Sequence, residues 1–144
     1  RRGVGRVIGL VIVAHGALGD ALLAAVEHVV GPQSQAHAVA IDPADDLHAC
    51  QAEIDRMVAE ADTGQGVVLV TDMFGGTPSN LALGSMRGDR IEVICGANLP
   101  LLVKLAKCRD RPLADAVREA LATGHRAMDS AAGILDPDRA RKAP

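Results

Sequence analysis

Short apolar runs alternate along the chain with longer segments in which apolar residues recur at helical spacing. The runs cover residues 7–14, 36–41, 67–71 and 91–95. The first and third runs contain no charged residue, which is typical of strands buried on both faces of a parallel sheet. The sequence therefore predicts four strands separated by helices.

Five segments between and after these runs are predicted to be helices. They cover residues 18–30, 47–61, 78–86, 99–107 and 113–122. Gly31 and Pro32 stop the first of these helices, and Asp45 or Asp46 provides the N-cap of the second. Residues 126–130 are compatible with either a short last strand or a fraying end.

Strands that alternate with helices indicate βαβ units with right-handed crossovers. We expect an α/β fold: a single doubly wound domain with a central, mainly parallel four-stranded sheet of order 2-1-3-4, flanked by helices. This domain is assigned to residues 7–130. Residues 1–6, which contain no Met, are interpreted as an N-terminal extension or an expression remnant, and residues 131–144 as a flexible polar tail.

Composition and charge narrow the range of functions. The net charge is −3 and Phe74 is the single aromatic residue, so neither an electrostatic footprint nor base stacking supports nucleic-acid binding. The chain has three cysteines and no C-x-x-C motif, which argues against disulfides and a structural metal site. This use of cysteine indicates a reducing, cytoplasmic setting, and no apolar run is long enough to span a bilayer. We expect no metal and no cofactor.

Polar groups capable of chemistry follow the first and third predicted strands. His15 comes directly after the first strand and Asp72 directly after the third. In a sheet of order 2-1-3-4 these strands are neighbours, so the two side chains would face each other at one edge. A carboxylate that holds one imidazole nitrogen leaves the other free to attack phosphorus.

The segment after Asp72 has the composition of an anion-binding turn. Gly75 and Gly76 allow backbone N–H groups to approach a phosphoryl group, and Thr77 before Pro78 predicts a helix start with Thr77 as the N-cap. The positive end of that helix, together with the Thr77 hydroxyl, would favour phosphate. Each of these features alone has a plainer structural explanation, and their placement on one sheet edge is what favours a site.

Other residues near this edge are weaker candidates. Gly16, Phe74 and Asn98 are expected to line the same cleft, although Asn98 has the alternative role of N-cap for the following helix. The sequence contains no G-x-x-x-x-G-K-[ST] phosphate loop and no G-x-S-x-G elbow. These absences argue against a P-loop nucleotide hydrolase and an α/β-hydrolase.

Three stretches of the chain match a known family in order and spacing: residues 9–16 with His15-Gly16, residues 69–80 with Asp72-Met73-Phe74-Gly75-Gly76-Thr77-Pro78, and residues 94–102. They resemble the IIA component of the mannose-type (mannose/fructose/sorbose) phosphoenolpyruvate-dependent sugar phosphotransferase system. The stretch at residues 27–33 and the Thr71-Asp72-Met73-Phe74 variant are similar to stand-alone alphaproteobacterial versions, which often occur without a sugar permease.

The resemblance implies a mechanism and partners. The family takes a phosphoryl group from the carrier protein HPr on the histidine that matches His15 and donates it to a IIB component, with the membrane components IIC and IID involved only indirectly. The resemblance assigns Asp72 to orient the imidazole and the turn at Gly75, Gly76 and Thr77 to bind the phosphoryl group, without a metal. It also implies a homodimer that exchanges a last strand near residues 126–130.

Two alternatives accompany this expectation. The chain could be a regulatory phosphoprotein of a permease-less system, in which phosphorylated and free His15 bind a target differently. It could also be the phosphoryl-donor subunit of a dihydroxyacetone kinase, which shares the fold and the early histidine. The turn Gly75-Gly76-Thr77-Pro78 favours the IIA family over that kinase subunit. We expect Nε2 of His15 to be phosphorylated, with Nδ1–H on Asp72.

Overall fold

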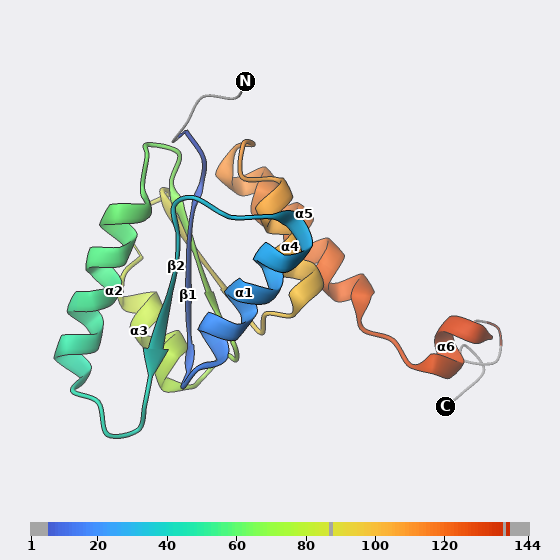
Figure 1. The fold of residues 1–144 in the computed structure, drawn as a ribbon, viewed down its shortest axis with the longest axis horizontal. Coiled ribbons are helices and arrows are strands. Elements are labelled where there is room, and N and C mark those ends of the chain that lie inside the picture. Colours follow the sequence, from blue (N-terminus) through green and yellow to red (C-terminus); the bar gives the residue numbers. More distant parts are fainter. Residues whose placement is uncertain (1–5, 87, 137, 139–144) are drawn as a thin grey trace.

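Four parallel strands form the centre of the molecule in the computed structural model, which describes residues 6–86, 88–136 and 138 (Figure 1). The sheet order is β2-β1-β3-β4, as the sequence predicted. The strands are β1 (Gly9–His15), β2 (Ala36–Ile41), β3 (Val67–Thr71) and β4 (Ile91–Cys95). All three pairings between neighbouring strands are parallel.

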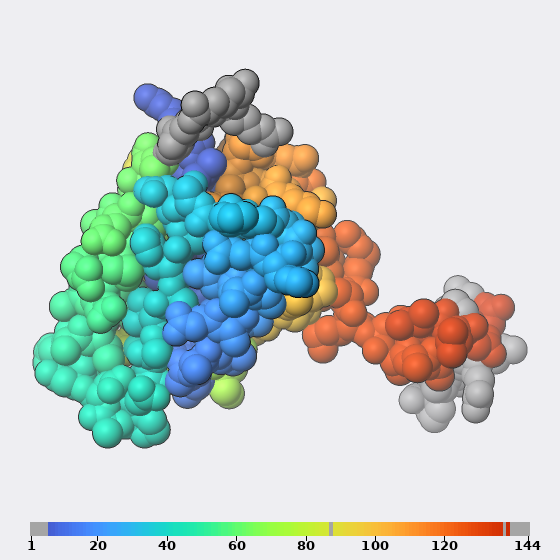
Figure 2. Space-filling view, viewed as in Figure 1, coloured from blue at the N-terminus to red at the C-terminus, as the bar shows by residue number. Residues whose placement is uncertain are grey.

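Helices cover both faces of this sheet, so the molecule has three layers. Their bounds are α1 (Leu18–Val30), α2 (Leu47–Ala61), α3 (Thr77–Gly84), α4 (Leu99–Lys107), α5 (Leu113–Ala127) and α6 (Ala131–Leu135). Helices α2 and α3 pack on one face, and α1, α4 and α5 pack on the other (Figure 1). The short helix α6 projects away from this body (Figure 2).

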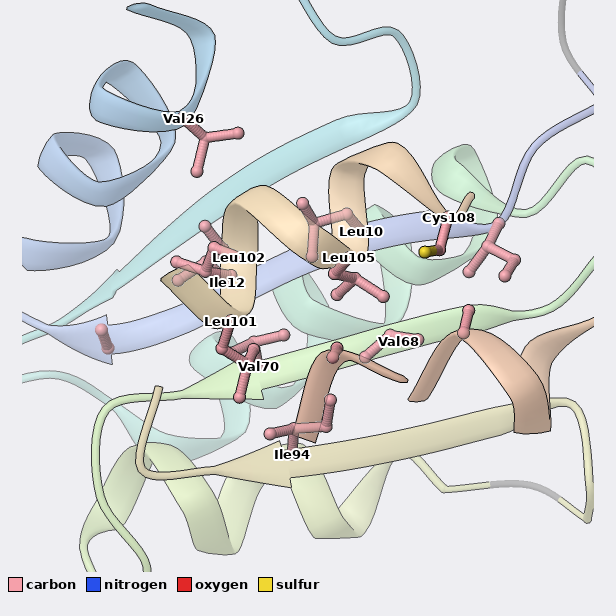
Figure 3. Packing of buried hydrophobic residues seen from close by; sticks show 14 residues of the cluster. Leu10, Ile12, Val26, Val68, Val70, Ile94, Leu101, Leu102, Leu105 and Cys108 are labelled. Carbon is pink, nitrogen blue, oxygen red and sulfur yellow. The ribbon is translucent and has the colours of Figure 1, made fainter. Parts of the chain in front are cut away.

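Alternate residues of each central strand feed two separate cores. Leu10 and Ile12 of β1 point to the face covered by α1, α4 and α5, where they join Leu102 of α4 (Figure 3). Val11 and Val13 point to the opposite face and join the core under α2. Because both faces are covered, β1 and β3 require uninterrupted apolar sequences, which explains the runs in the chain.

A buried arginine closes the end of the sheet where the strands begin. The Arg109 side chain donates from Nε to the Ile8 carbonyl (2.7 Å) and from Nη2 to the carbonyls of Ser34 (2.6 Å) and Gln35 (2.8 Å). Its Nη1 donates to Oε1 of Gln33. Burial lowers the pKa of Arg109 to about 10, so the guanidinium stays charged at neutral pH. It ties the segments entering β1 and β2 to the turn after α4.

The strand bounds agree with the sequence expectations except in the first strand. Pairing in β1 begins at Gly9 and extends to His15, whereas the apolar run predicted residues 7–14. The side chain of Asp46, one of two predicted caps, accepts a hydrogen bond at the start of α2. Of the described residues, no helix is long and apolar enough to cross a membrane.

The C-terminal part of the chain differs more from the expectations. Helix α5 continues to Ala127, five residues beyond its predicted end, and residues 128–130 form no regular element in this single chain, so the strand exchanged in a dimer stays a prediction. Gly124, which looks like a helix end, is buried inside α5, where a Cβ atom would lie 3.0 Å from Leu101. It allows α4 and α5 to pack closely. A short helix, α6, lies where a flexible tail was expected; residues 1–5, 137 and 139–144 lie outside the described residues.

Candidate functional site

The ends of β1 and β3 bring His15 and Asp72 together, as the sheet order predicted. His15 is the last residue of β1, and Asp72 follows Thr71 at the end of β3. The imidazole Nδ1 lies 2.6 Å from Oδ2 of Asp72, and the His15 backbone N–H donates to the same oxygen at 3.1 Å. Two hydrogen bonds thus fix both the backbone and the ring of His15 against one carboxylate.

The two members of the pair differ in exposure, which suits different tasks. The His15 side chain is 50% exposed and the Asp72 side chain 13%. Burial alone would raise the pKa of Asp72, but hydrogen bonds from the ring and backbone of His15 outweigh it and hold the pKa below its ordinary value. An ionised Asp72 requires the proton on Nδ1 of a neutral imidazole, so the Nε2 lone pair is available for chemistry.

The turn after Asp72 passes directly beside the exposed part of the ring. A Cβ atom on Gly76 would lie 3.2 Å from Cε1 of His15 and 3.5 Å from its Nε2. Only a glycine fits this approach without displacing the ring. The backbone of Gly76 is therefore next to the nitrogen that the Asp72 contact leaves free.

Helix α3 starts at this turn, with its N-cap residue beside the His15 ring. Gly76 is the N-cap and Pro78 lies in the first turn, so the prediction that Thr77 is the N-cap is wrong by one residue. The N–H groups of Gly76 and Thr77 meet no hydrogen-bond acceptor within the part of the chain that is described. Free N–H groups at a helix start attract anions.

Gly75 does not offer its N–H group to a ligand. This group donates to Oγ of Ser79 at 2.9 Å, so the prediction that Gly75 binds the phosphoryl group directly is corrected to a role in the turn. Ser79 was not predicted as a site residue. Its hydrogen bond depends on the three-dimensional course of the turn, and the sequence shows only a serine in the first turn of a helix.

The three weaker candidates have separate places. Gly16 forms the turn after β1, and its N–H group donates to the Ile41 carbonyl at 3.0 Å. Phe74 is 73% exposed on the turn after β3. Asn98 takes its alternative role: its Oδ1 caps α4 by accepting from the N–H of Leu101, and its Nδ2 donates to the carbonyl of Gly124. Its polar atoms are thus used within the fold.

A cavity of about 390 Å³ opens beside His15, on the β2 side of the ring. Its lining residues are His15, Ile41, Asp42, Pro43, Asp45, Leu47 and Thr77. Asp42 and Pro43 belong to the turn that follows β2. The strand pairing of His15 with Ile41 is what places this turn beside the site. A larger cavity of about 610 Å³ lies elsewhere, between β4 and α5.

The arrangement combines a nucleophile, an orienting base and an anion site. Nε2 of His15 can attack an electrophile such as phosphorus, Asp72 holds the opposite nitrogen, and the α3 start offers two N–H donors. Across the described residues, no group of three or more His, Cys, Asp or Glu side chains is placed to hold a metal ion.

Fold and site together define a doubly wound α/β domain with an Asp-oriented histidine at the carboxyl edge of its sheet. A family model described as "PTS system fructose IIA component" (EIIA-man) matches residues 9–122. The chain therefore belongs to the mannose-type IIA components of the sugar phosphotransferase system (PTS). Membership in this family supports a phosphotransferase role.

Individual relatives agree with this assignment. Over 104 residues the chain is 31% identical to the "PTS system mannose-specific EIIAB component" of Escherichia coli K12, covering 72% of this chain and 32% of that protein. The chain thus spans about a third of that relative's length. It is 32% identical to the "Putative phosphotransferase enzyme IIA component YadI" of Escherichia coli K12, over 78% of this chain and 77% of that protein.

Solved structures share the architecture. A PTS IIA protein associated with the fucose utilization operon of Streptococcus pneumoniae has a TM-score of 0.83 at 23% identity, covering 93% of this chain and all of that one. A mannose/sorbose-specific IIA subunit from Enterococcus faecalis has a TM-score of 0.76 at 25% identity, covering 85% and 93%. These similarities support the three-layer fold described above.

Proposed function

We propose that the protein is a cytoplasmic phosphohistidine carrier that accepts a phosphoryl group on Nε2 of His15 from phosphorylated HPr. It then donates this group to a IIB component. The observation that carries the proposal is the 2.6 Å contact between Nδ1 of His15 and Asp72, with the free N–H groups of Gly76 and Thr77 on the turn beside Nε2. Membership in the PTS IIA family supports the choice of chemistry.

The transfer needs no cofactor. The Nε2 lone pair of His15 forms a bond to phosphorus while the P–N bond of the donor phosphohistidine breaks, and that electron pair returns to the donor imidazole. Charge on the phosphoryl oxygens is stabilised by the N–H groups of Gly76 and Thr77 and by the Thr77 hydroxyl. Asp72 stabilises the positive charge that develops on the His15 ring, because it accepts the hydrogen bond from Nδ1.

The surface around His15 suits a protein partner better than a small molecule. Large apolar side chains are exposed near the site on the starts of α1 and α2 and on the turn after β3: Leu18 (44%), Leu47 (54%), Met73 (54%) and Phe74 (73%). Exposed apolar groups of this kind are typical of interaction surfaces. The half-exposed imidazole would be reached by a phosphohistidine presented on the surface of another protein.

The direct test measures intact mass after incubation with phosphoenolpyruvate, enzyme I and HPr. We expect an acid-labile gain of one phosphoryl group in the wild type and none in His15→Ala. Folding of both proteins is checked by circular dichroism. A folded wild-type protein that gains no phosphoryl group would contradict the proposal.

Addition of purified IIB components to the phosphorylated protein tests the second half of the transfer. Loss of the phosphoryl group from His15 to IIB supports the carrier function. Retention in the presence of every IIB component of the source genome would instead support the regulatory alternative, in which the phosphorylated protein itself is the output.

We also propose that the protein forms a homodimer through the free edge of its sheet. Among the described residues, strand β4 pairs with β3 alone, and the 610 Å³ cavity between β4 and α5 forms a groove beside it, lined by apolar groups that include Ile91, Leu113 and Val117. Beyond α5, residues 128–135 leave the body and carry the exposed side chains of Ile134 and Leu135 (Figure 2). Docking of residues 128–135 into the groove of a second copy would cover the groove and the exposed side chains of Ile134 and Leu135.

Analytical ultracentrifugation of the full chain and of the double variant Ile134→Asp/Leu135→Asp tests this dimer. The wild type should sediment as a dimer and the variant as a monomer.

A further inference from the structure

Ser79 joins both sides of the turn that lies against His15. Its side chain is fully buried on the first turn of α3. The hydroxyl accepts a hydrogen bond from the N–H of Gly75 (2.9 Å) and donates one to the carbonyl of Gly76 (2.9 Å). A rigid helix thereby holds two consecutive glycines through a single oxygen atom.

Two glycines in sequence would otherwise leave this turn conformationally free. Gly75 has a φ of +89°, in the left-handed region, and a Cβ atom there would have no neighbour within 4 Å. No side chain packs against the position that a Gly75 Cβ would occupy, and glycine has the largest conformational entropy in the absence of restraint. The two hydrogen bonds with Ser79 restrain this segment, together with the Met73 N–H bond to Asp72 and the Asn80 N–H bond to the Gly76 carbonyl.

The bond to the Gly76 carbonyl also sets the direction of an N–H group in the site. The carbonyl of Gly76 and the N–H of Thr77 belong to the same planar trans peptide, so they point in opposite directions. Fixing the carbonyl toward Ser79, inside the protein, fixes the N–H of Thr77 away from it. The carbonyl also accepts from the N–H of Asn80 (3.1 Å), which strengthens the same orientation.

We propose that Ser79 is a positioning residue for phosphoryl transfer, holding the Gly75–Gly76 turn so that the Thr77 N–H group is oriented before the phosphoryl group arrives. This inference rests on the proposed function of His15. It assigns to Ser79 no contact with the phosphoryl group itself. Preorganised donors avoid reorganisation during the reaction, so their loss lowers the rate of the chemical step.

Ser85 offers a matched control at the other end of the same helix. It is 2% exposed, and its hydroxyl accepts from Nε2 of Gln51 (2.7 Å) and donates to Oδ1 of Asp55 (2.6 Å). Ser79→Ala and Ser85→Ala therefore each remove one buried hydroxyl that accepts one hydrogen bond and donates another. Only Ser79 contacts the turn beside His15.

The experiment compares phosphorylation of wild type, Ser79→Ala and Ser85→Ala by phosphorylated HPr. We expect Ser79→Ala to reduce kcat at least about tenfold, since misorientation of a preorganised donor is costly. Its KM for phosphorylated HPr should be unchanged because Ser79 is buried away from the surface. Ser85→Ala should retain wild-type kcat although urea unfolding shows a comparable loss of stability in both variants.

A spectroscopic measurement separates positioning from a general structural role. In ¹⁵N-labelled protein, phosphorylation of His15 should shift the amide resonances of Gly76 and Thr77 in wild type and Ser85→Ala. The Thr77 shift should be reduced in Ser79→Ala once it is fully phosphorylated. Should Ser79→Ala not fold, Ser79→Cys, whose larger thiol forms weaker hydrogen bonds, carries the same predictions.

Two outcomes would overturn the inference: wild-type kcat in a folded Ser79 variant, or equal losses of kcat in the Ser79 and Ser85 variants. Failure of the proposed function is distinct from both. In that case neither the wild type nor Ser85→Ala gains a phosphoryl group at all.

Discussion

The two ends of the parallel sheet are built in opposite ways. Where the strands begin, Arg109 is buried and donates to three backbone carbonyls and one side-chain amide. Where they end, His15 is half exposed, and the N–H groups of Gly76 and Thr77 have no acceptor in the described part of the chain. One end satisfies its polar groups internally, and the other leaves them available.

This difference follows from the topology. In a parallel sheet with helical crossovers, the carboxyl ends of all strands lie at the same end of the sheet, and helix starts such as that of α3 lie at that end too. Unpaired N–H groups there would be stabilised by an anion and are of no benefit to the fold alone. We therefore expect substitutions at the carboxyl end to affect transfer, and substitutions at the amino end to affect stability.

The largest effect is expected for Asp72→Ala at the carboxyl end. Loss of the orienting carboxylate should slow phosphorylation of His15 by about ten- to a thousandfold, by analogy with other orienting acids. The free energy of unfolding should change by less than about 1 kcal/mol, because the pair lies at a partly exposed edge. Quench-flow phosphorylation by HPr and urea unfolding measure the two quantities.

Asp46→Ala is the control for that substitution. Asp46 caps α2 and does not contact His15, so its loss should reduce stability and leave the phosphorylation rate unchanged. An Asp72→Ala protein that is phosphorylated at the wild-type rate would remove the orienting role of Asp72.

A smaller effect of the opposite kind is expected for Arg109→Met at the amino end. Methionine retains an apolar stem but leaves the carbonyls of Ile8 and Gln35 without the guanidinium donors. We expect a loss of about 2–4 kcal/mol in the free energy of unfolding. The phosphorylation rate of the folded variant should equal that of the wild type.

Arg111→Met provides the comparison for Arg109. Arg111 lies two residues further along and pairs with Glu119 on the surface, where its side chain is 50% exposed. Its replacement should leave the free energy of unfolding nearly unchanged, because exposed ion pairs contribute little to stability. Similar losses for the two arginines would mean that the buried hydrogen bonds of Arg109 do not hold the amino end together.

The same contrast explains what the sequence could predict. Three strands, at residues 36–41, 67–71 and 91–95, match the structure residue for residue because aspartate, glycine and proline mark their ends. His15 and Asp72 could be paired from the sheet order alone, since each follows or ends a neighbouring strand. The alternation of strands with helices predicts a parallel sheet, and the order 2-1-3-4 expected for such a sheet places the strands of His15 and Asp72 side by side.

What the sequence did not reveal depends on contacts between distant segments. A glycine often marks the end of a helix, but Gly124 lies within α5. It is a glycine there because Leu101 approaches too closely for a larger residue. The involvement of Asp42 depends on the pairing of His15 with Ile41. Ser79 and Arg109 likewise acquire their roles through hydrogen bonds that no local pattern signals.

The smallest effect on stability is expected for Asp62→Asn. Asp62 lies between α2 and β3, at the same end of the sheet as Arg109. A hydrogen bond from Arg90 holds the pKa of Asp62 below its ordinary value of 3.8 against the opposing effect of burial, and the Gly64 N–H adds to the lowering. A lowered folded-state pKa stabilises the fold above the unfolded value, and this contribution disappears as the pH falls through the folded-state pKa.

Urea unfolding of wild type and Asp62→Asn between pH 7 and pH 3 tests this. The variant should be slightly less stable at pH 7, because the pair with Arg90 is partly exposed, and the difference should shrink as the pH falls below the ordinary Asp62 pKa of 3.8. Added salt should narrow the gap at pH 7, since an exposed ion pair is screened. Phosphorylation of His15 at pH 7 should be the same in both proteins. A lower rate in the variant would mean that the two ends of the sheet are coupled, because Asp62 lies at the opposite end of the strands from His15 and can reach the site only through the fold.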